Sequence, residues 1–187
     1  MRVFIGIQLP AAVRRACAAG MQELGMRMQG WWTLEENLHV TLAFIGEIEP
    51  SRIGEIEAIM EETVARFAAP EMALDGVGVF EKKRDAIVHA RVQSTPSAAP
   101  LHEFLIGSLQ EAGFPVNPGP FSPHITLARK AQIPAGIETL AETPLPQAVF
   151  VPAQLTLFES ARDAQNVLRY TPIRCCGWRN DANPVEF

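Results

Sequence analysis

Residues 39–42 and 124–127 repeat one order of side chains: histidine, aliphatic residue, threonine, leucine. Side chains at positions i and i+2 of a β-strand project from the same face. On a strand, each unit would therefore present an imidazole and a hydroxyl on one face and anchor two aliphatic side chains in the core. A single unit of this kind occurs by chance, but two matching copies favour a shared chemical purpose.

Cleavage of a phosphodiester requires a base for the attacking oxygen, an acid for the leaving oxygen, and donors that stabilise the developing negative charge. An imidazole with an ordinary pKa near 6.5 can serve as acid or base near neutral pH. We predict that the two units face each other across one cleft, with His39 and His124 as acid and base. Thr41 and Thr126 are expected to hold the phosphate, with no metal and no cofactor.

The elements that must position these units follow from hydrophobic periodicity and from glycine and proline. We expect strands at residues 2–9, 38–45, 72–80, 87–92, 124–128, 149–158 and 167–174. Helices are expected at residues 10–30, 51–70 and 101–113, and His102 on the last of these is expected to be exposed. We expect linkers at residues 31–37, 114–123 and 133–146, and an irregular tail from Cys175.

The strands and helices alternate in two comparable blocks, and each block holds one His-x-Thr strand after a helix. We interpret this as an old duplication that produced an α+β fold of two pseudo-symmetric antiparallel sheets with outer helices. The active-site groove would then lie between two intertwined lobes, and residues 1–187 would form one domain.

Charge and composition limit the class of partner. The formal charge of −5 opposes nonspecific binding to long nucleic acid but allows a nucleotide or RNA end in a local pocket. No apolar run is long enough to cross a bilayer, and the first residues lack a signal-peptide core. These two features lead us to expect a cytoplasmic location. The three cysteines form neither a disulfide framework nor a zinc-ligand pattern, so we expect reduced thiols. A monomer is also expected.

Residues 36–48 and 121–129 resemble the two signature segments of the two-histidine (2H) phosphoesterases. The bacterial RNA 2′,3′-cyclic phosphodiesterase branch, historically called 2′-5′ RNA ligase, is the most similar. The resemblance extends to residues 1–10, 76–80 and 157–160, and thus over almost the whole chain.

The resemblance implies hydrolysis of a 2′,3′-cyclic phosphate on a nucleotide, or on an RNA or tRNA end, to a 2′-phosphomonoester. His39 and His124 match the catalytic histidines, and Thr41 and Thr126 match the phosphate-binding threonines. In family terms His39 protonates the departing O3′ and His124 activates water, but pseudo-symmetry leaves this assignment open.

Phe44 and Arg129 each lie five residues after a motif histidine, which suggests a sandwich around the terminal nucleobase. A regular strand would instead place both on the face opposite the histidines, and packing of Phe44 in the core is an equal alternative. His89 has no threonine partner and is expected to pack at a lobe face.

Other functions remain open at the level of the sequence. The same site could ligate RNA ends in the reverse direction, or open another cyclic phosphate such as one on ADP-ribose. The chain could also bind nucleotides or RNA ends without catalysis, although the intact His-x-Thr pairs oppose that reading.

Overall fold

Strands and helices alternate along the computed structural model, which describes residues 1–141, 143 and 145–178. The strands are β1 (Arg2–Gln8), β2 (Gln29–Trp32), β3 (His39–Glu47), β4 (Met72–Glu81), β5 (Ala86–Ser94), β6 (His124–Gln132), β7 (Val149–Phe150), β8 (Gln154–Arg162) and β9 (Leu168–Gly177). The helices are α1 (Ala11–Gly25), α2 (Ile53–Arg66), α3 (Ala98–Glu111) and the short α4 (Glu138–Ala141). Two 3₁₀ turns, η1 (Glu35–Asn37) and η2 (Pro50–Arg52), precede β3 and α2.

The strands pair antiparallel in the order β7-β4-β5-β6-β3-β1-β8-β9, and β2 pairs with β6 beside the main path. The two halves of this sheet meet at β3 and β6, where Val40 opposite Ile125 is the paired position. We call the half with β3, β1, β8 and β9 the β3 lobe, and the half with β6, β5, β4, β7 and β2 the β6 lobe. Each lobe draws strands from distant parts of the sequence.

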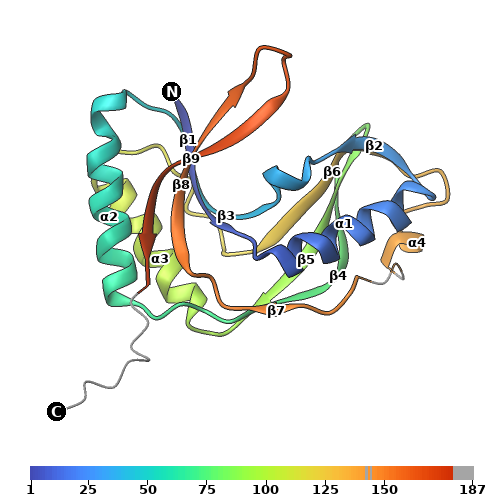
Figure 1. The fold of residues 1–187 in the computed structure, drawn as a ribbon, viewed down its shortest axis with the longest axis horizontal. Helices are drawn as coiled ribbons and strands as arrows, with labels where there is room; N and C mark the ends of the chain where they lie inside the picture. The colour runs from blue at the N-terminus through green and yellow to red at the C-terminus, as the bar shows by residue number, and fades with distance from the viewer. Residues whose placement is uncertain (142, 144, 179–187) are drawn as a thin grey trace.

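Helices cover the two lobes on different sides of the molecule (Figure 1). Helices α2 and α3 pack on each other, α2 contacts β9, and α3 contacts β3. Helix α1 crosses in front of β4, β5 and β6 in the view of Figure 1, and α4 lies at its far end. The apolar faces of α1, α2 and α3 join the strands in one hydrophobic cluster. The predicted α+β fold of two antiparallel lobes with outer helices is confirmed, and the two sheets are joined at the β3–β6 pair.

Several element boundaries differ from those expected. Residues 29–32 were expected at the end of a helix and in a linker. They form β2, because Trp31 and Trp32 pair with Arg129 and Ala128 on β6. The strand expected at residues 149–158 is divided into β7 and β8. The loop at 133–146 contains α4, and Cys175 and Cys176 belong to β9 rather than to an irregular tail. Residues 179–187 of that tail lie outside the described residues.

The expectation that His102 is exposed is wrong. Its side chain is only 7% exposed, and its Nε2 lies 3.1 Å from the Leu42 carbonyl oxygen. Its ring stacks on Phe121 with a centroid distance of 4.7 Å. Because a carbonyl oxygen only accepts, Nε2 carries the proton and His102 fastens α3 to β3.

Candidate active site

The antiparallel pairing of β3 with β6 brings the two His-x-Thr units together. With Val40 opposite Ile125, the register places His39 beside Thr126 and Thr41 beside His124. The histidines and threonines are partly exposed, whereas the aliphatic residues between and after them are buried. One face of this strand pair therefore carries both imidazoles and both hydroxyls.

Each motif histidine is held by the carbonyl two residues before it. His39 Nδ1 lies 2.7 Å from the Asn37 oxygen, and His124 Nδ1 lies 2.9 Å from the Ser122 oxygen. Since a carbonyl oxygen cannot donate, both Nδ1 atoms carry hydrogen and donate it. In each ring, Nε2 is thus the nitrogen left to exchange a proton. Nε2 of His39 lies 3.0 Å from the Thr41 hydroxyl.

Both motif strands contain a β-bulge at the leucine of the motif. On β3, Ala43 and Thr41 pair with the consecutive residues Ile5 and Gly6, so Leu42 is the extra residue. On β6, Leu127 is likewise skipped, because Ala128 and Thr126 pair with the consecutive residues Val88 and His89. A bulge shifts the alternation of side chains by one position.

The bulges decide where Phe44 and Arg129 lie. A regular strand would have turned both away from the histidines, but both are exposed, and Phe44 retains 49% of its surface. They line a cavity of about 450 Å³ together with His39 and Thr41. The regular-strand expectation is therefore wrong, and the alternative of Phe44 in the core is not what the structure shows.

Aromatic rings surround His39 on the β3 lobe. Its ring centroid lies 4.7 Å from Phe4, 5.0 Å from Tyr170 and 5.8 Å from Phe158. Burial is the main cause that lowers the pKa of His39 to about 4; the Asn37 carbonyl opposes the change, and Arg129 and His124 add to it. His39 is therefore neutral at pH 7 in the free chain.

A third histidine lies beside His124 on the same face of the sheet. His89 on β5 is 6% exposed, stacks on Phe80 at a centroid distance of 4.1 Å, and meets the His124 ring at 5.2 Å. Burial, followed by the charge of His124, lowers the pKa of His89 to about 4. The sequence pointed to packing but not to this contact, because only the β5–β6 register places His89 opposite Thr126.

Asn37 is a further residue of the site that sequence reasoning missed. Its amide is buried, donates to the Leu168 carbonyl at 2.8 Å, and accepts from the Tyr170 amide at 3.1 Å. The same residue supplies the carbonyl that holds His39. The signal available in the sequence was a polar residue two positions before the histidine. The structure shows that this residue is buried and that it fastens β9 to the motif.

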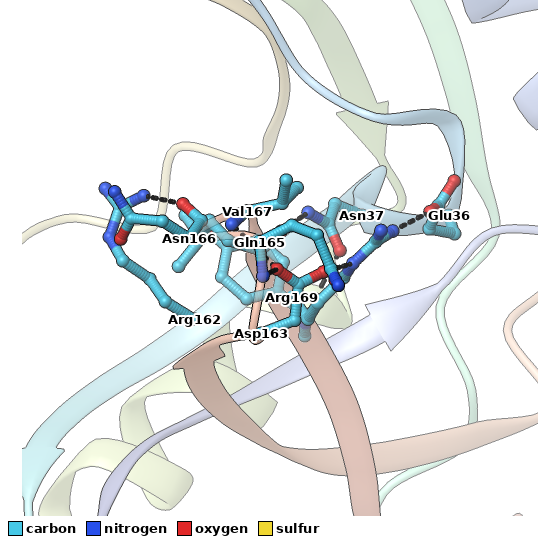
Figure 2. Close-up of polar contacts among 10 residues, drawn as sticks. Glu36, Asn37, Arg162, Asp163, Gln165, Asn166, Val167 and Arg169 are labelled. Atoms are coloured by element: carbon cyan, nitrogen blue, oxygen red, sulfur yellow. Dashed lines mark hydrogen bonds and ion pairs between the residues drawn. The ribbon is translucent and has the colours of Figure 1, made fainter.

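The β8–β9 turn is fixed by Asp163 (Figure 2). Its carboxylate accepts from the amides of Gln165 and Val167 at 3.0 and 2.8 Å and from Arg169 at 2.9 Å. Arg169 also pairs with Glu36 of η1, as Figure 2 shows. The turn is thus tied to the segment that leads into His39, and it holds Arg162 beside the groove.

Two cavities adjoin both His39 and Arg129. The 450 Å³ cavity reaches Thr41, Phe44 and Arg2, and a second cavity of about 270 Å³ reaches Thr126, Trp31 and Trp32. Arg129 and Arg162 line both and give the groove positive charge despite the acidic chain. Among the residues that the structure describes, no three His, Cys, Asp or Glu side chains gather as metal ligands.

Fold and site together define a two-lobed protein with one His-x-Thr strand from each lobe at a shared groove. A family model described as the 2′-5′ RNA ligase superfamily matches residues 27–164. The chain therefore belongs to the 2′-5′ RNA ligase superfamily, whose members are two-histidine phosphoesterases.

Individual relatives agree with this assignment. The RNA 2′,3′-cyclic phosphodiesterase of Thermotoga maritima is 33% identical over 144 residues, which cover 76% of each chain. The protein of that name from Geobacillus stearothermophilus is 31% identical over 132 residues, or 69% of this chain but only 42% of that longer relative. The crystal structure of E. coli LigT complexed with 3′-AMP superposes with a TM-score of 0.75 at 25% identity and covers 94% of this chain and 97% of that one.

Proposed function

We propose that the protein hydrolyses the 2′,3′-cyclic phosphate of an RNA end or nucleotide to a 2′-phosphomonoester. The observation that carries this proposal is the pair of imidazoles on adjacent strands, each with Nδ1 tied to a carbonyl and Nε2 left for proton transfer. The relatives named above bear the name of this activity.

In the proposed reaction, one histidine removes a proton from water, and the water oxygen attacks phosphorus. The bond between phosphorus and O3′ breaks, the second histidine protonates O3′, and the phosphate stays on O2′. Thr41 and Thr126 donate hydrogen bonds to the nonbridging oxygens, and Arg129 and Arg162 add positive charge beside the phosphate.

The lowered pKa of His39 bears on which histidine acts as the acid and which as the base. A neutral His39 is ready to act as a base, whereas the role of acid requires it to gain a proton first. A bound phosphate anion would favour that gain, because an adjacent negative charge raises the pKa of an imidazole. If His39 protonates O3′, substrate binding and proton uptake are therefore coupled.

Phe44 and Arg129 are proposed to hold the terminal nucleobase. The two bulges bring both side chains to the cavity that contains His39, and a planar guanidinium and an aromatic ring both stack well on a base. Phe44→Ala and Arg129→Ala should each raise KM for cyclic nucleotides about tenfold. Unchanged kinetics in both variants would contradict the sandwich.

The deciding experiment is incubation with 2′,3′-cyclic nucleotides, cyclic-phosphate-ended RNA and ADP-ribose cyclic phosphate in the presence of a chelator. We expect turnover of the nucleotide or RNA substrates to 2′-phosphates. A 3′-phosphate product, or no turnover at all, would contradict the proposal. Joining of RNA ends in a parallel reaction would identify ligation as an additional activity.

The protein is further proposed to act as a cytoplasmic monomer. All three cysteines are free, which suits a reducing compartment. No helix among the described residues has the length and apolarity needed to span a membrane. Light scattering of the purified protein tests the monomer, since a dimer would double the measured mass.

A further inference from the structure

The second cavity beside His39 is not used by a mononucleotide bound as proposed above. Its wall contains the large side chains of Trp31, Trp32 and Leu34, of which Trp31 is 64% and Leu34 is 37% exposed. Side chains of this kind are rarely left exposed together around a hollow unless the surface binds something. We call the part of the cavity formed by these three residues the tryptophan hollow.

The proposed phosphate position lies between the tryptophan hollow and the 450 Å³ cavity lined by Phe44, which we call the Phe44 cavity. The Phe44 cavity reaches Thr41, the tryptophan hollow reaches Thr126, and both reach His39 and Arg129. A phosphate held by both threonines therefore has one cavity on each side.

The covalent structure of a nucleotide matches this arrangement. In a ribose 2′,3′-cyclic phosphate, the base is attached next to C2′, and the 5′ chain is attached next to C3′. Base and 5′ chain thus leave the phosphate on opposite sides. When the terminal base occupies the Phe44 cavity, the 5′ chain points toward the tryptophan hollow.

We propose that the tryptophan hollow binds the nucleotide that precedes the cyclic-phosphate terminus, so that the preferred substrate is an RNA end of two or more nucleotides. This inference rests on the proposed function and specifies its substrate.

The chemistry of the hollow fits a nucleotide rather than an apolar partner. Trp31 stands opposite Arg129 in the β2–β6 pairing, and the Lys130 ammonium lies 3.7 Å from the centroid of the Trp31 ring. Arg162, fixed by the β8–β9 turn of Figure 2, lines the same cavity. Aromatic surface for a base and cations for the linking phosphate are the usual components of a single-strand binding site.

The experiment compares kcat/KM for 2′,3′-cyclic AMP with kcat/KM for ApA that ends in a 2′,3′-cyclic phosphate. The native chain should prefer the dinucleotide about tenfold, and Trp31→Ala and Leu34→Ala should each move this ratio toward one. Val149→Ala, which shortens another exposed apolar side chain (65% exposed) outside both cavities, serves as the matched control and should keep the native ratio.

Two results would overturn the inference: a native ratio near one, or a native ratio kept in both variants. If the ratio is kept because both substrates lose kcat/KM equally, the tryptophan hollow holds the terminal base instead. If neither substrate is hydrolysed, the proposed function fails. Tryptophan fluorescence titrations with the 2′-phosphates of adenosine and ApA then decide the inference, since it requires tighter binding of ApA that Trp31→Ala abolishes.

Discussion

The two His-x-Thr strands have the same local structure but different surroundings. Both show the same order of buried and exposed residues from the histidine to position i+5, the same carbonyl contact at i−2, and the same bulge at i+3. The strand next to each motif differs, however. Thr41 faces Gly6 on β1, whereas Thr126 faces His89 on β5.

A glycine adjoins the motif strand in the β3 lobe, whereas in the β6 lobe the glycine lies one strand further out. On the β3 lobe, a Cβ on Gly6 would lie 2.7 Å from the Val40 carbonyl oxygen, so a glycine is needed where β1 approaches β3. On the β6 lobe, His89 stands on the inner strand, and Gly78 on β4 leaves space for it. The face with the His-x-Thr side chains is thus repeated, but its surroundings are not. His39 is enclosed by Phe4, Phe158 and Tyr170, whereas His124 contacts Phe80 and a second imidazole, His89.

The largest expected effect tests whether each lobe supplies one proton-transfer group. His39→Ala and His124→Ala should each lower kcat on a 2′,3′-cyclic nucleotide by about 10²–10⁴-fold, since each removes one proton-transfer group. Single-turnover kinetics measure the loss, and thermal unfolding checks the fold. A variant that keeps a tenth of the native rate would show that its histidine is not a proton-transfer group.

Asn37 tests whether the two lobes differ in how the segment before the histidine is anchored. Asn37→Ala leaves the Leu168 carbonyl and the Tyr170 amide without their partner, which should cost about 1–3 kcal/mol in urea unfolding. It should also lower kcat, because the segment whose backbone carbonyl positions His39 is then no longer tied to β9. Ser122→Ala is the matched control, because only the Ser122 backbone contacts His124. Equal effects of the two substitutions would contradict the difference between the lobes.

Gly78 tests the packing of His89 beside His124. A Cβ at this position would lie 2.4 Å from His89 Nε2, so Gly78→Ala must displace the ring that contacts His124. We expect kcat to fall about tenfold, because small errors in the position of a catalytic group are costly. Gly54→Ala, where a Cβ meets no atom within 4 Å, should keep full activity. Full activity in Gly78→Ala would mean that His89 does not position His124.

The smallest effect concerns stability and pH. His39 has a pKa of about 4 in the folded chain and an ordinary pKa of 6.5 when unfolded, so between these values the unfolded chain binds more protons. The free energy of unfolding should therefore fall as pH decreases from 6.5 to 4, and His39 should add no pH dependence above that window. His39→Gln should reduce this slope in urea titrations at several pH values. An unchanged slope would show that burial does not govern the His39 pKa.

Much of the fold follows from local patterns in the sequence. Period-two alternation at residues 2–9 and the helical spacing of apolar residues at 53–67 identify β1 and α2, because each pattern lies within the element itself. The burial of β1 on both faces, however, depends on its neighbours in the fold. The paired motifs likewise indicated two lobes and a groove, since their spacing of i and i+2 already fixes a common strand face. The catalytic roles of their side chains stay predictions until the histidine variants are measured.

Only the tertiary structure decided which strands are neighbours. The Trp31–Trp32 segment is a strand because β6 supplies its hydrogen-bond partners, and nothing in its own periodicity shows this. The bulges at Leu42 and Leu127, which turn Phe44 and Arg129 into the groove, depend on registers with β1 and β5. Hydrogen-bond register joins residues far apart in the chain, and it therefore has no local signature in the sequence.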